Sequence, residues 1–520
     1  MRTNTNTILA TICAAGALVS CDDAQQKESL PNVVIIFTDD MGYGDISAFN
    51  NQSLIQTPHI DQLASEGMVF TKAHASGSVC TPSRYSLLTG RYAFRSERAQ
   101  TVIWSYDSSA IERGRMTLGN LFQNAGYSTA IIGKWHLGLN WVTKDGEEPK
   151  TDNETGYSNV DYTKPVEVGP NDFGFEYSFI HPASTDIPPY LFLRNHLPVD
   201  PNMVIANEVY PKRLPDTEYS WDRRFIADND IYWRLGVWWR NGELSASLRI
   251  EDIHTDIMTD AREYIDSHAQ MHKDKPFFML LSLTGPHTPW LAEEPFRGKS
   301  ELGDYGDFVL TMDHVVKDIR DALEKNGFSK NTIIIFTSDN GAPWPEIQIE
   351  NSGHQANLGR RGQKGDIHDG GHRVPMIIHW PGVINQPRSY HNLVSLKDIF
   401  ATAAELTDQE IPANAGEDSF SFLEVLRGDL DQVVRNTMVH HSSGHMFGIR
   451  YGEWKYIEGL GSGGFTHPAF IEPAPGEPTG QLYNIEADSL ESENLFFVHP
   501  EIVTKLQNEL SRLRTTGEAR

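Results

Sequence analysis

The sequence predicts an α/β fold in which a large mixed, mostly parallel sheet is sandwiched by helices, with a smaller α+β subdomain at the C-terminal end. Three observations predict it: continuous apolar runs that each end in polar residues, amphipathic helical segments between these runs, and a change to short strands near residue 425. The 520 residues, 39% of them hydrophobic, are enough to bury the cores of one large domain and one smaller one.

Four apolar, β-branched runs indicate strands that are buried on both faces. They span residues 31–38, 127–132, 276–282 and 331–337. Each run leads directly into polar residues, and ligands of parallel α/β sheets bind beyond the carboxyl ends of the strands. We therefore expect the polar residues that follow the four strands to share one edge of the sheet.

Helical signals lie between and after these runs. Residues 57–67 have a threonine N-cap, a first-turn proline and a terminal glycine, and residues 308–327 carry apolar side chains at helical spacing. Strands that alternate with helices imply right-handed crossovers. Further along the chain we expect a helix at 393–406, short strands at 437–441 and 446–450, and a closing helix at 500–513.

The stretch 145–240 is rich in Pro, Asn, Asp and aromatic residues and has weak periodicity. We predict that it forms long loops, which in a compact enzyme usually build the binding site. We accordingly expect the chain to divide into a large domain, 31–425, that contains the binding site, and a C-terminal subdomain, 426–520.

The first 30 residues have the features of an export signal. A charged start and a short apolar run occupy residues 1–20, and the run is too short to span a bilayer stably. Cys21 follows in a context that resembles a bacterial lipoprotein processing site, and residues 21–30 would form a polar tether. The alternative is an ordinary cleaved signal with an accidental cysteine. We expect an exported lipoprotein, in the periplasm or on the outer membrane or cell surface, that contacts the membrane only through its N-terminal lipid.

The net charge of −26 argues against sequence-independent binding of nucleic acid. An anionic substrate would have to be captured by a local basic pocket, against the field of the whole chain.

Cys80 is the one cysteine left once Cys13 has departed with the signal and Cys21 carries lipid, so no disulfide framework is expected. A single cysteine in a long chain is usually an inert, buried residue. Cys80, however, lies just before a predicted helix in which Pro82 occupies the first turn and Gly90 the C-terminal end. Free backbone N–H groups at that position favour a negatively charged group.

Four oxygen donors follow two of the predicted strands. They are Asp39, Asp40, Asp339 and Asn340. Three carboxylates and an amide suit calcium or magnesium, whereas zinc prefers imidazole or thiolate ligands. Any one of these aspartates alone could simply cap a loop or helix, but two pairs at two strand ends favour a metal site.

In Cys80 and these four oxygen donors, and over about residues 31–515 as a whole, the chain resembles the type I, formylglycine-dependent sulfatases of the alkaline phosphatase superfamily. The resemblance rests on the Cys-x-Pro-x-Arg motif at 80–84 and on the Leu-Leu-Thr-Gly-Arg that follows at 87–91. It implies an alkaline-phosphatase-like fold and a sulfuric ester hydrolase. It also implies that a maturation enzyme oxidises Cys80 to Cα-formylglycine, whose hydrated form supplies the attacking hydroxyl.

The same resemblance assigns roles to the polar residues. One Ca²⁺ ion would be held by Asp39, Asp40, Asp339, Asn340 and the modified residue 80. Arg84 would stabilise the charged diol, Lys134 and Lys364 would bind sulfate, His136 would act as a base and His287 would protonate the leaving oxygen. Asp369 stands where the family commonly has glutamate, a conservative difference.

Exported lipoprotein sulfatases of bacteria mostly act on sulfated polysaccharides, so the resemblance favours a sulfated glycan as substrate. Residues 180–190 resemble sulfatases acting on galactose or N-acetylgalactosamine sulfate esters, with O4 as the expected position. The candidate sugar contacts are Asp186, Arg223, Arg224, His354 and Arg361. Taken singly, each of these could instead be structural or solvated.

Two other functions stay open at this point. A phosphomonoester or phosphonate hydrolase could share the fold, although a phosphatase of this superfamily would be expected to hold two zinc ions and to use a serine or threonine nucleophile. A non-catalytic glycan-binding lipoprotein would leave Cys80 unconverted, but every catalytic position is filled.

Overall fold

The structure is a computed structural model that describes Met1 and residues 30–104, 106–152, 154–210 and 236–516. Cys21 and the predicted export signal, together with Arg223 and Arg224, lie outside the described residues. Among the described residues, no helix has the length and apolar character needed to cross a membrane.

A sheet of ten strands forms the centre of the large domain, in the order β13-β2-β12-β11-β1-β10-β4-β5-β6-β7. Strands β11, β1, β10, β4 and β5 are all parallel, whereas β12 pairs with β11 in the antiparallel sense. This confirms the predicted mixed, mostly parallel sheet. The strands are β1 (Asn32–Asp39), β2 (Met68–Phe70), β4 (Ser128–Lys134), β5 (Tyr177–His181), β6 (Leu193–Arg194), β7 (Leu197–Pro198), β10 (Phe277–Pro286), β11 (Thr332–Ser338), β12 (Met376–His379) and β13 (Arg388–Tyr390).

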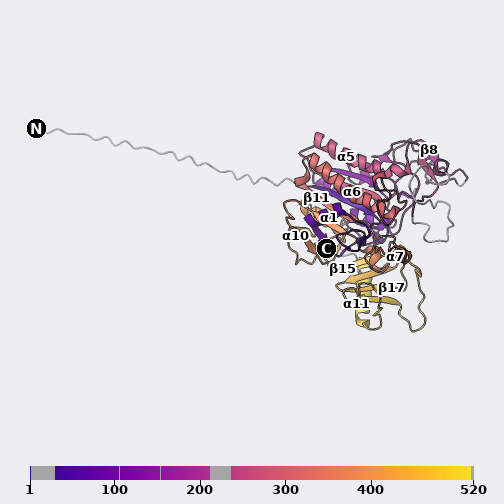
Figure 1. The fold of residues 1–520 in the computed structure, drawn as a ribbon, viewed down its shortest axis with the longest axis vertical. Coiled ribbons are helices and arrows are strands. Elements are labelled where there is room, and N and C mark those ends of the chain that lie inside the picture. The colour runs from indigo at the N-terminus through magenta and orange to yellow at the C-terminus, as the bar shows by residue number, and fades with distance from the viewer. Residues whose placement is uncertain (2–29, 105, 153, 211–235, 517–520) are drawn as a thin grey trace. The chain divides into compact units, whose positions relative to one another are not determined.

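Helices cover both faces of this sheet because its central strands are apolar on both sides. In β10, Phe277 and Met279 belong to the core beneath α5 (Ile253–Met271) and α6 (Asp304–Lys325), which lie side by side in Figure 1. The intervening Phe278 points the other way and stacks on a phenylalanine of α3 (Leu118–Asn124) at 4.3 Å between ring centroids. Alternation along one strand thus serves two helical layers. Also present are α1 (Pro58–Glu66), packed against α6, and α9 (Asp398–Leu406), packed against α3.

The C-terminal end forms the predicted smaller subdomain. Its antiparallel sheet has the order β15-β16-β17-β18, and α11 (Pro500–Thr516) packs against it. Val439, Ile449, Leu506 and Leu510 share one buried apolar cluster with Tyr92 of the large domain. The strands are β15 (Thr437–His441), β16 (Phe447–Tyr451), β17 (Trp454–Glu458) and β18 (Gly480–Asn484).

Two local predictions need correction. The helix after Val79 begins at Cys80 itself, so α2 (Cys80–Thr89) includes the cysteine in its first turn, and Gly90 ends it at φ 65°. The stretch 145–240 is not loop throughout, because β5 extends the main sheet beside β4. Only five residues long, β5 carries too short a pattern to distinguish a strand from a loop.

The remaining elements are short and lie mainly in connections. They are β3 (Ala73–His74), β8 (Met203–Ile205), β9 (Glu243–Ser245), β14 (Val394–Ser395), α4 (Ala206–Val209), α7 (Glu346–Ser352), α8 (Asp369–His372), α10 (Leu423–Arg427) and the 3₁₀ turns at Tyr43–Asp45, Ala93–Arg95, Pro170–Phe173, Ile250–Asp252, Glu294–Phe296 and Ser329–Asn331.

A buried ion pair joins α9 to the chain that enters β15. Arg435 Nε donates to Asp398 Oδ2 at 2.9 Å, and both side chains are almost fully buried. Replacing Arg435 with methionine leaves the Asp398 carboxylate without this partner, so we expect the free energy of unfolding to fall by about 3–5 kcal/mol. Denaturant titration measures this loss. Arg427→Met is the matched control, because Arg427 is half exposed in its pair with Glu424 and its loss should cost less than about 1 kcal/mol. Equal losses would contradict the prediction.

Candidate active site

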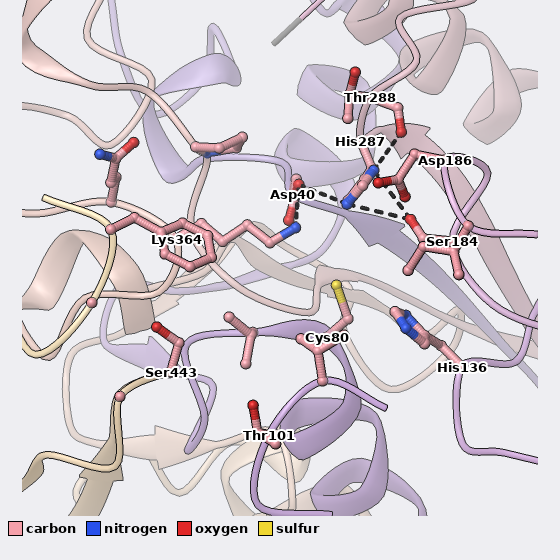
Figure 2. A pocket seen from close by; sticks show the side chains of 18 of the residues that line it. Asp40, Cys80, Thr101, His136, Ser184, Asp186, His287, Thr288, Lys364 and Ser443 are labelled. Carbon is pink, nitrogen blue, oxygen red and sulfur yellow. Dashed lines mark hydrogen bonds and ion pairs between the residues drawn. The ribbon is translucent and has the colours of Figure 1, made fainter. Parts of the chain in front are cut away.

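The four predicted strand ends meet at one edge of the sheet. Because β4, β10, β1 and β11 are adjacent and parallel, their carboxyl ends bring Lys134, His287, Asp39 and Asp339 together. Figure 2 shows the Cys80 sulfur pointing toward Asp40, with the Lys364 ammonium and the His287 ring both next to that carboxylate. The sequence therefore predicted correctly which loops converge.

Each carboxylate in this cluster has its own cationic partner. Lys134 Nζ lies 2.6 Å from Asp39 Oδ2, Lys364 Nζ lies 2.7 Å from Asp40 Oδ2, and Arg84 Nη2 lies 2.8 Å from Asp339 Oδ2. Three negative charges thus balance three positive charges. Since all six side chains are buried, these pairings satisfy charges that would otherwise be costly in the interior.

The donor atoms of the same cluster also suit a hard cation. Asn340 Oδ1 is buried and has no hydrogen-bond partner, while its Nδ2 donates to Asp40 Oδ1 at 2.7 Å. Ligand atoms of Asp39, Cys80 and Asp339 all lie within 4.8 Å of one another. Burial and the neighbouring Asp39 raise the pKa of Asp339. A dication would favour the ionised carboxylate and satisfy the orphaned amide oxygen, so the donor set fits calcium or magnesium.

Two residues of the cluster adopt left-handed backbone conformations that are unusual outside glycine. Asp40 has φ 67° and His136 has φ 55°. Such conformations cost of order 1–3 kcal/mol each and persist only where the surroundings impose them. Asp40 is held by its backbone N–H, which donates to Asp339 Oδ1 at 3.1 Å, and the His136 N–H donates to the carbonyl of Pro182 at 3.0 Å. Both side chains lie near Cys80 in Figure 2.

Cys80 lies in the middle of this arrangement, in the first turn of α2. Its Sγ is 3.5 Å from Asp39 Oδ1, and the residue is buried. Burial raises the pKa of the Cys80 thiol, which is therefore protonated at neutral pH and a weak nucleophile. Arg84, one turn further along α2, also donates to Ser282 Oγ at 2.6 Å and so fixes the helix against β10.

The two histidines of the site, His136 and His287, differ in the contacts of their ring nitrogens. His136 Nε2 is 3.2 Å from the carbonyl oxygen of Ile103, which marks Nε2 as the protonated nitrogen, and the buried Nδ1 has no partner. Burial and the nearby Lys134 lower the pKa of His136 well below its usual value, so its imidazole is neutral. His287 contacts Ser184 Oγ at 3.2 Å, and its Nε2 lies 3.7 Å from Asp40 Oδ2.

Replacing His136 with alanine is expected to lower turnover by about 10²–10⁴-fold, because a positioned base contributes that much to proton transfer. Steady-state release of sulfate, the product that the sequence predicts, measures the effect. His314→Ala on α6 provides the control. That histidine is partly exposed, and it contacts Asp318 of the same helix and the ring of Phe296. Turnover that falls no further in His136→Ala than in His314→Ala would refute a catalytic role.

A cavity of about 560 Å³ opens above Cys80, within the range of small-molecule sites. Of the predicted sugar contacts, Asp186 lines this cavity. His354 does not line it; it is buried, and its Nε2 lies 2.8 Å from Asp45 Oδ1. Arg361 is likewise directed elsewhere, with its Nη1 3.0 Å from the Tyr483 hydroxyl.

Several lining residues were not predicted as site residues. Arg240 lies between two indoles, with its guanidinium carbon 5.0 Å from the ring centroids of both Trp104 and Trp238. It forms an ion pair with Asp186. Although burial raises the pKa of Asp186, Arg240 and His287 lower it to about 2, and Asp186 Oδ1 has no partner. No motif marks Arg240, Trp104 or Trp238; an abundance of tryptophan was the available signal, and it does not say which indoles reach the cavity.

Comparison with known proteins gives the family. The sulfatase family model matches residues 31–409, most of the chain. The chain belongs to the sulfatase family. An N-acetylgalactosamine-6-O-sulfatase of Bacteroides thetaiotaomicron is 32% identical over 98% of this chain and 99% of its own length. Steryl-sulfatase of Mus musculus is 30% identical over 81% of this chain and 69% of its own length. The chain is therefore a sulfuric ester hydrolase.

Solved structures agree with this sulfatase fold. A Bacteroides thetaiotaomicron protein from work on the metabolism of multiple glycosaminoglycans has a TM-score of 0.78 at 30% identity, covering 94% of this chain and 100% of its own. A protein in complex with a neocarrahexaose has a TM-score of 0.66 at 21% identity, covering 94% of this chain and 93% of its own, and shows the fold alone.

Proposed function

We propose that this sulfatase, after conversion of Cys80 to Cα-formylglycine, removes sulfate from O6 of an N-acetylgalactosamine or galactose unit in a sulfated glycan. The observation that carries the proposal is the position of Cys80: it lies beneath a cavity, amid three carboxylate–cation pairs, and Asp186 lines the wall of the same cavity. The conversion replaces the sulfur and two hydrogens of the side chain with an aldehyde oxygen, and the oxidant is supplied with a formylglycine-generating maturation enzyme.

We further propose that Asp39, Asp40, Asp339 and Asn340, together with residue 80, hold one calcium ion. When bound, such an ion polarises a sulfate oxygen and favours the ionised form of a coordinated hydroxyl. The cluster is electrically balanced without it. Two added positive charges would therefore leave a surplus that attracts an anionic ester, in spite of the net charge of −26.

The side chains around Cys80 then act on the ester. In this proposal Lys134 and Lys364 bind sulfate oxygens from two sides, an assignment supported by the position of their ammonium groups beside the carboxylates of Asp39 and Asp40. His287, next to Ser184, delivers a proton to the leaving sugar oxygen, and Nδ1 of His136, which has no partner, accepts one. Overall, water is consumed, and the sugar alcohol and sulfate are released.

The choice of sugar and position rests on two supports. Residues 180–190 resemble enzymes acting on galactose or N-acetylgalactosamine esters, and the relative that matches over the full chain is named for the 6-O-sulfate of N-acetylgalactosamine. We place O6 ahead of O4 because that relative covers the whole chain. Asp186 supports a sugar as ligand, since its ionised carboxylate lines the cavity and a carboxylate accepts hydrogen bonds from hydroxyl groups.

Sulfate release from defined disaccharides tests the proposal. Enzyme co-expressed with a maturation enzyme is given disaccharides sulfated at O6 or at O4 of N-acetylgalactosamine, with a phosphate monoester as the comparison. We expect the O6 ester to be hydrolysed fastest. Faster release from O4 would overturn the position, and release of phosphate without sulfate would favour a phosphomonoester or phosphonate hydrolase. Binding of the disaccharides without hydrolysis would favour a glycan-binding lipoprotein.

We also propose that Cys21 is lipidated and anchors the exported enzyme. The motif before Cys21 supports this assignment. Cys21→Ser is expected to prevent incorporation of labelled fatty acid during expression in a bacterium. Incorporation that continues in this variant would overturn the assignment and leave the catalytic proposal unaffected.

A further inference from the structure

The C-terminal subdomain supplies one wall of the active-site cavity. Figure 2 places Ser443 across the cavity from Ser184 and Asp186. Residues 463–470, which connect β17 to β18, add aromatic side chains to the same wall. The lining residues of this wall are Ser443, Gly444, Gly463, Gly464, Phe465, His467 and Phe470.

Phe470 remains 60% exposed although it borders a cavity. Large apolar side chains left open beside a concave site usually mark a binding surface. On the opposite wall, Trp104 is 52% exposed and stacks on Arg240. The cavity mouth is thus bordered by exposed aromatic rings from two distant parts of the sequence.

Two glycines leave space for the phenylalanine rings to pack against the backbone. A Cβ atom added to Gly365 would come within 2.7 Å of the Phe465 ring, and one added to Gly444 would come within 2.8 Å of the Phe470 ring. Gly365 also has φ 88°, a conformation that favours glycine. Phe470 therefore packs on Gly444 and still remains largely exposed.

The segment that carries these rings is tied to the loop that carries Lys364. The Thr466 N–H and hydroxyl donate to the Asp366 carboxylate at 2.9 and 2.5 Å, and Gln363 Nε2 donates to Thr466 Oγ1 at 3.1 Å. Phe465, packed on Gly365, is consequently next to the sulfate-binding lysine. Phe470 lies on the outer part of the same wall.

We propose that Phe465 and Phe470 form a stacking platform for the pyranose ring that adjoins the sulfated sugar, so that the enzyme prefers an oligosaccharide to a sulfated monosaccharide. This inference rests on the proposed function. The reacting sugar lies between Asp186 and residue 80 at the base of the cavity. The neighbouring sugar of the oligosaccharide then contacts the platform, and the apolar C–H groups of its pyranose ring pack on the aromatic side chains.

The test compares two substrates that carry the same sulfated sugar, a monosaccharide and an oligosaccharide in which that sugar is the reacting unit. Phe470→Ala is expected to lower kcat/KM for the oligosaccharide about 10-fold, mainly through KM, while kcat/KM for the monosaccharide changes less than about twofold. Phe470→Trp retains an aromatic face and should keep the preference for the oligosaccharide. Phe497→Ala is the matched control, because Phe497 is 62% exposed on the same subdomain and does not line the cavity.

Equal losses on both substrates in Phe470→Ala, or an effect no larger than that of Phe497→Ala, would overturn the platform. In either case the wild-type enzyme would still desulfate both sugars, so the proposed function would stand. Wild-type enzyme that desulfates neither sugar while hydrolysing a small aryl sulfate would overturn both the platform and the glycan assignment. A second measurement does not depend on activity. In a Cys80→Ala background, Phe470→Ala is expected to weaken binding of the oligosaccharide.

Discussion

Replacing Cys80 with alanine is expected to lower the rate of sulfate release by at least about 10⁴-fold, because removal of a catalytic nucleophile costs losses of this order or larger. The fold should tolerate the change. Cys80 is a small side chain in the first turn of α2, and its contacts are with the charged cluster rather than with the apolar core. Sulfate release and the unfolding midpoint, measured on the same preparations, separate loss of chemistry from loss of structure.

The mass of the peptide containing Cys80 decides whether the modification accounts for this effect. Active enzyme should carry the aldehyde form, and enzyme produced without a maturation system should carry the thiol and be inactive. Ser83→Ala is a suitable control, since Ser83 is buried in the same helix and its hydroxyl has no hydrogen-bond partner. Full activity in protein whose Cys80 is entirely unmodified would refute the formylglycine assignment.

The sequence predicted well the inner half of the site, the charged residues around Cys80, because these residues follow regular strands or lie in a helix. Asp39 and Asp339 end buried parallel strands, and the topology of a parallel sheet brings such ends together whatever lies between them in the chain. Lys134 and His287 follow from the same reasoning. The motif around Cys80 identified the helix, although that helix begins two residues before its proline.

The outer half could not be predicted, because it depends on packing between segments without periodicity. Arg240 reaches Asp186 only once residues 236–245 have packed on the loop that follows β5, and nothing in the local sequence marks that contact. The position of Phe470 depends on the C-terminal subdomain, whose placement is set by long-range contacts. His354 shows the opposite failure: it was a candidate sugar contact, but the fold turns it inward onto Asp45.

Removing the divalent cation is expected to lower sulfate release by at least about 10³-fold, and added calcium should restore it. Without the ion, each carboxylate of the cluster is neutralised by a lysine or arginine, so the cations that should hold sulfate are occupied by Asp39, Asp40 and Asp339. Loss of a preorganised electrostatic contact typically costs 10²–10³-fold, and here the ion and the freed lysines are lost together. Dialysis against chelator, followed by titration with calcium or magnesium, measures the effect.

Calcium binding itself distinguishes a metal site from a purely ionic cluster. Asp339→Asn removes one negative charge but keeps an oxygen donor, so titration calorimetry should show much weaker calcium binding with the fold retained. Asp313→Asn is the matched control: Asp313 is also buried, but its carboxylate accepts from the backbone N–H groups of His59 and Ile60 at the start of α1. If activity survives exhaustive chelation, or both variants bind calcium like the wild type, then the three ion pairs neutralise the cluster without any metal. Lys134 and Lys364 would then be structural partners of the aspartates rather than ligands for sulfate.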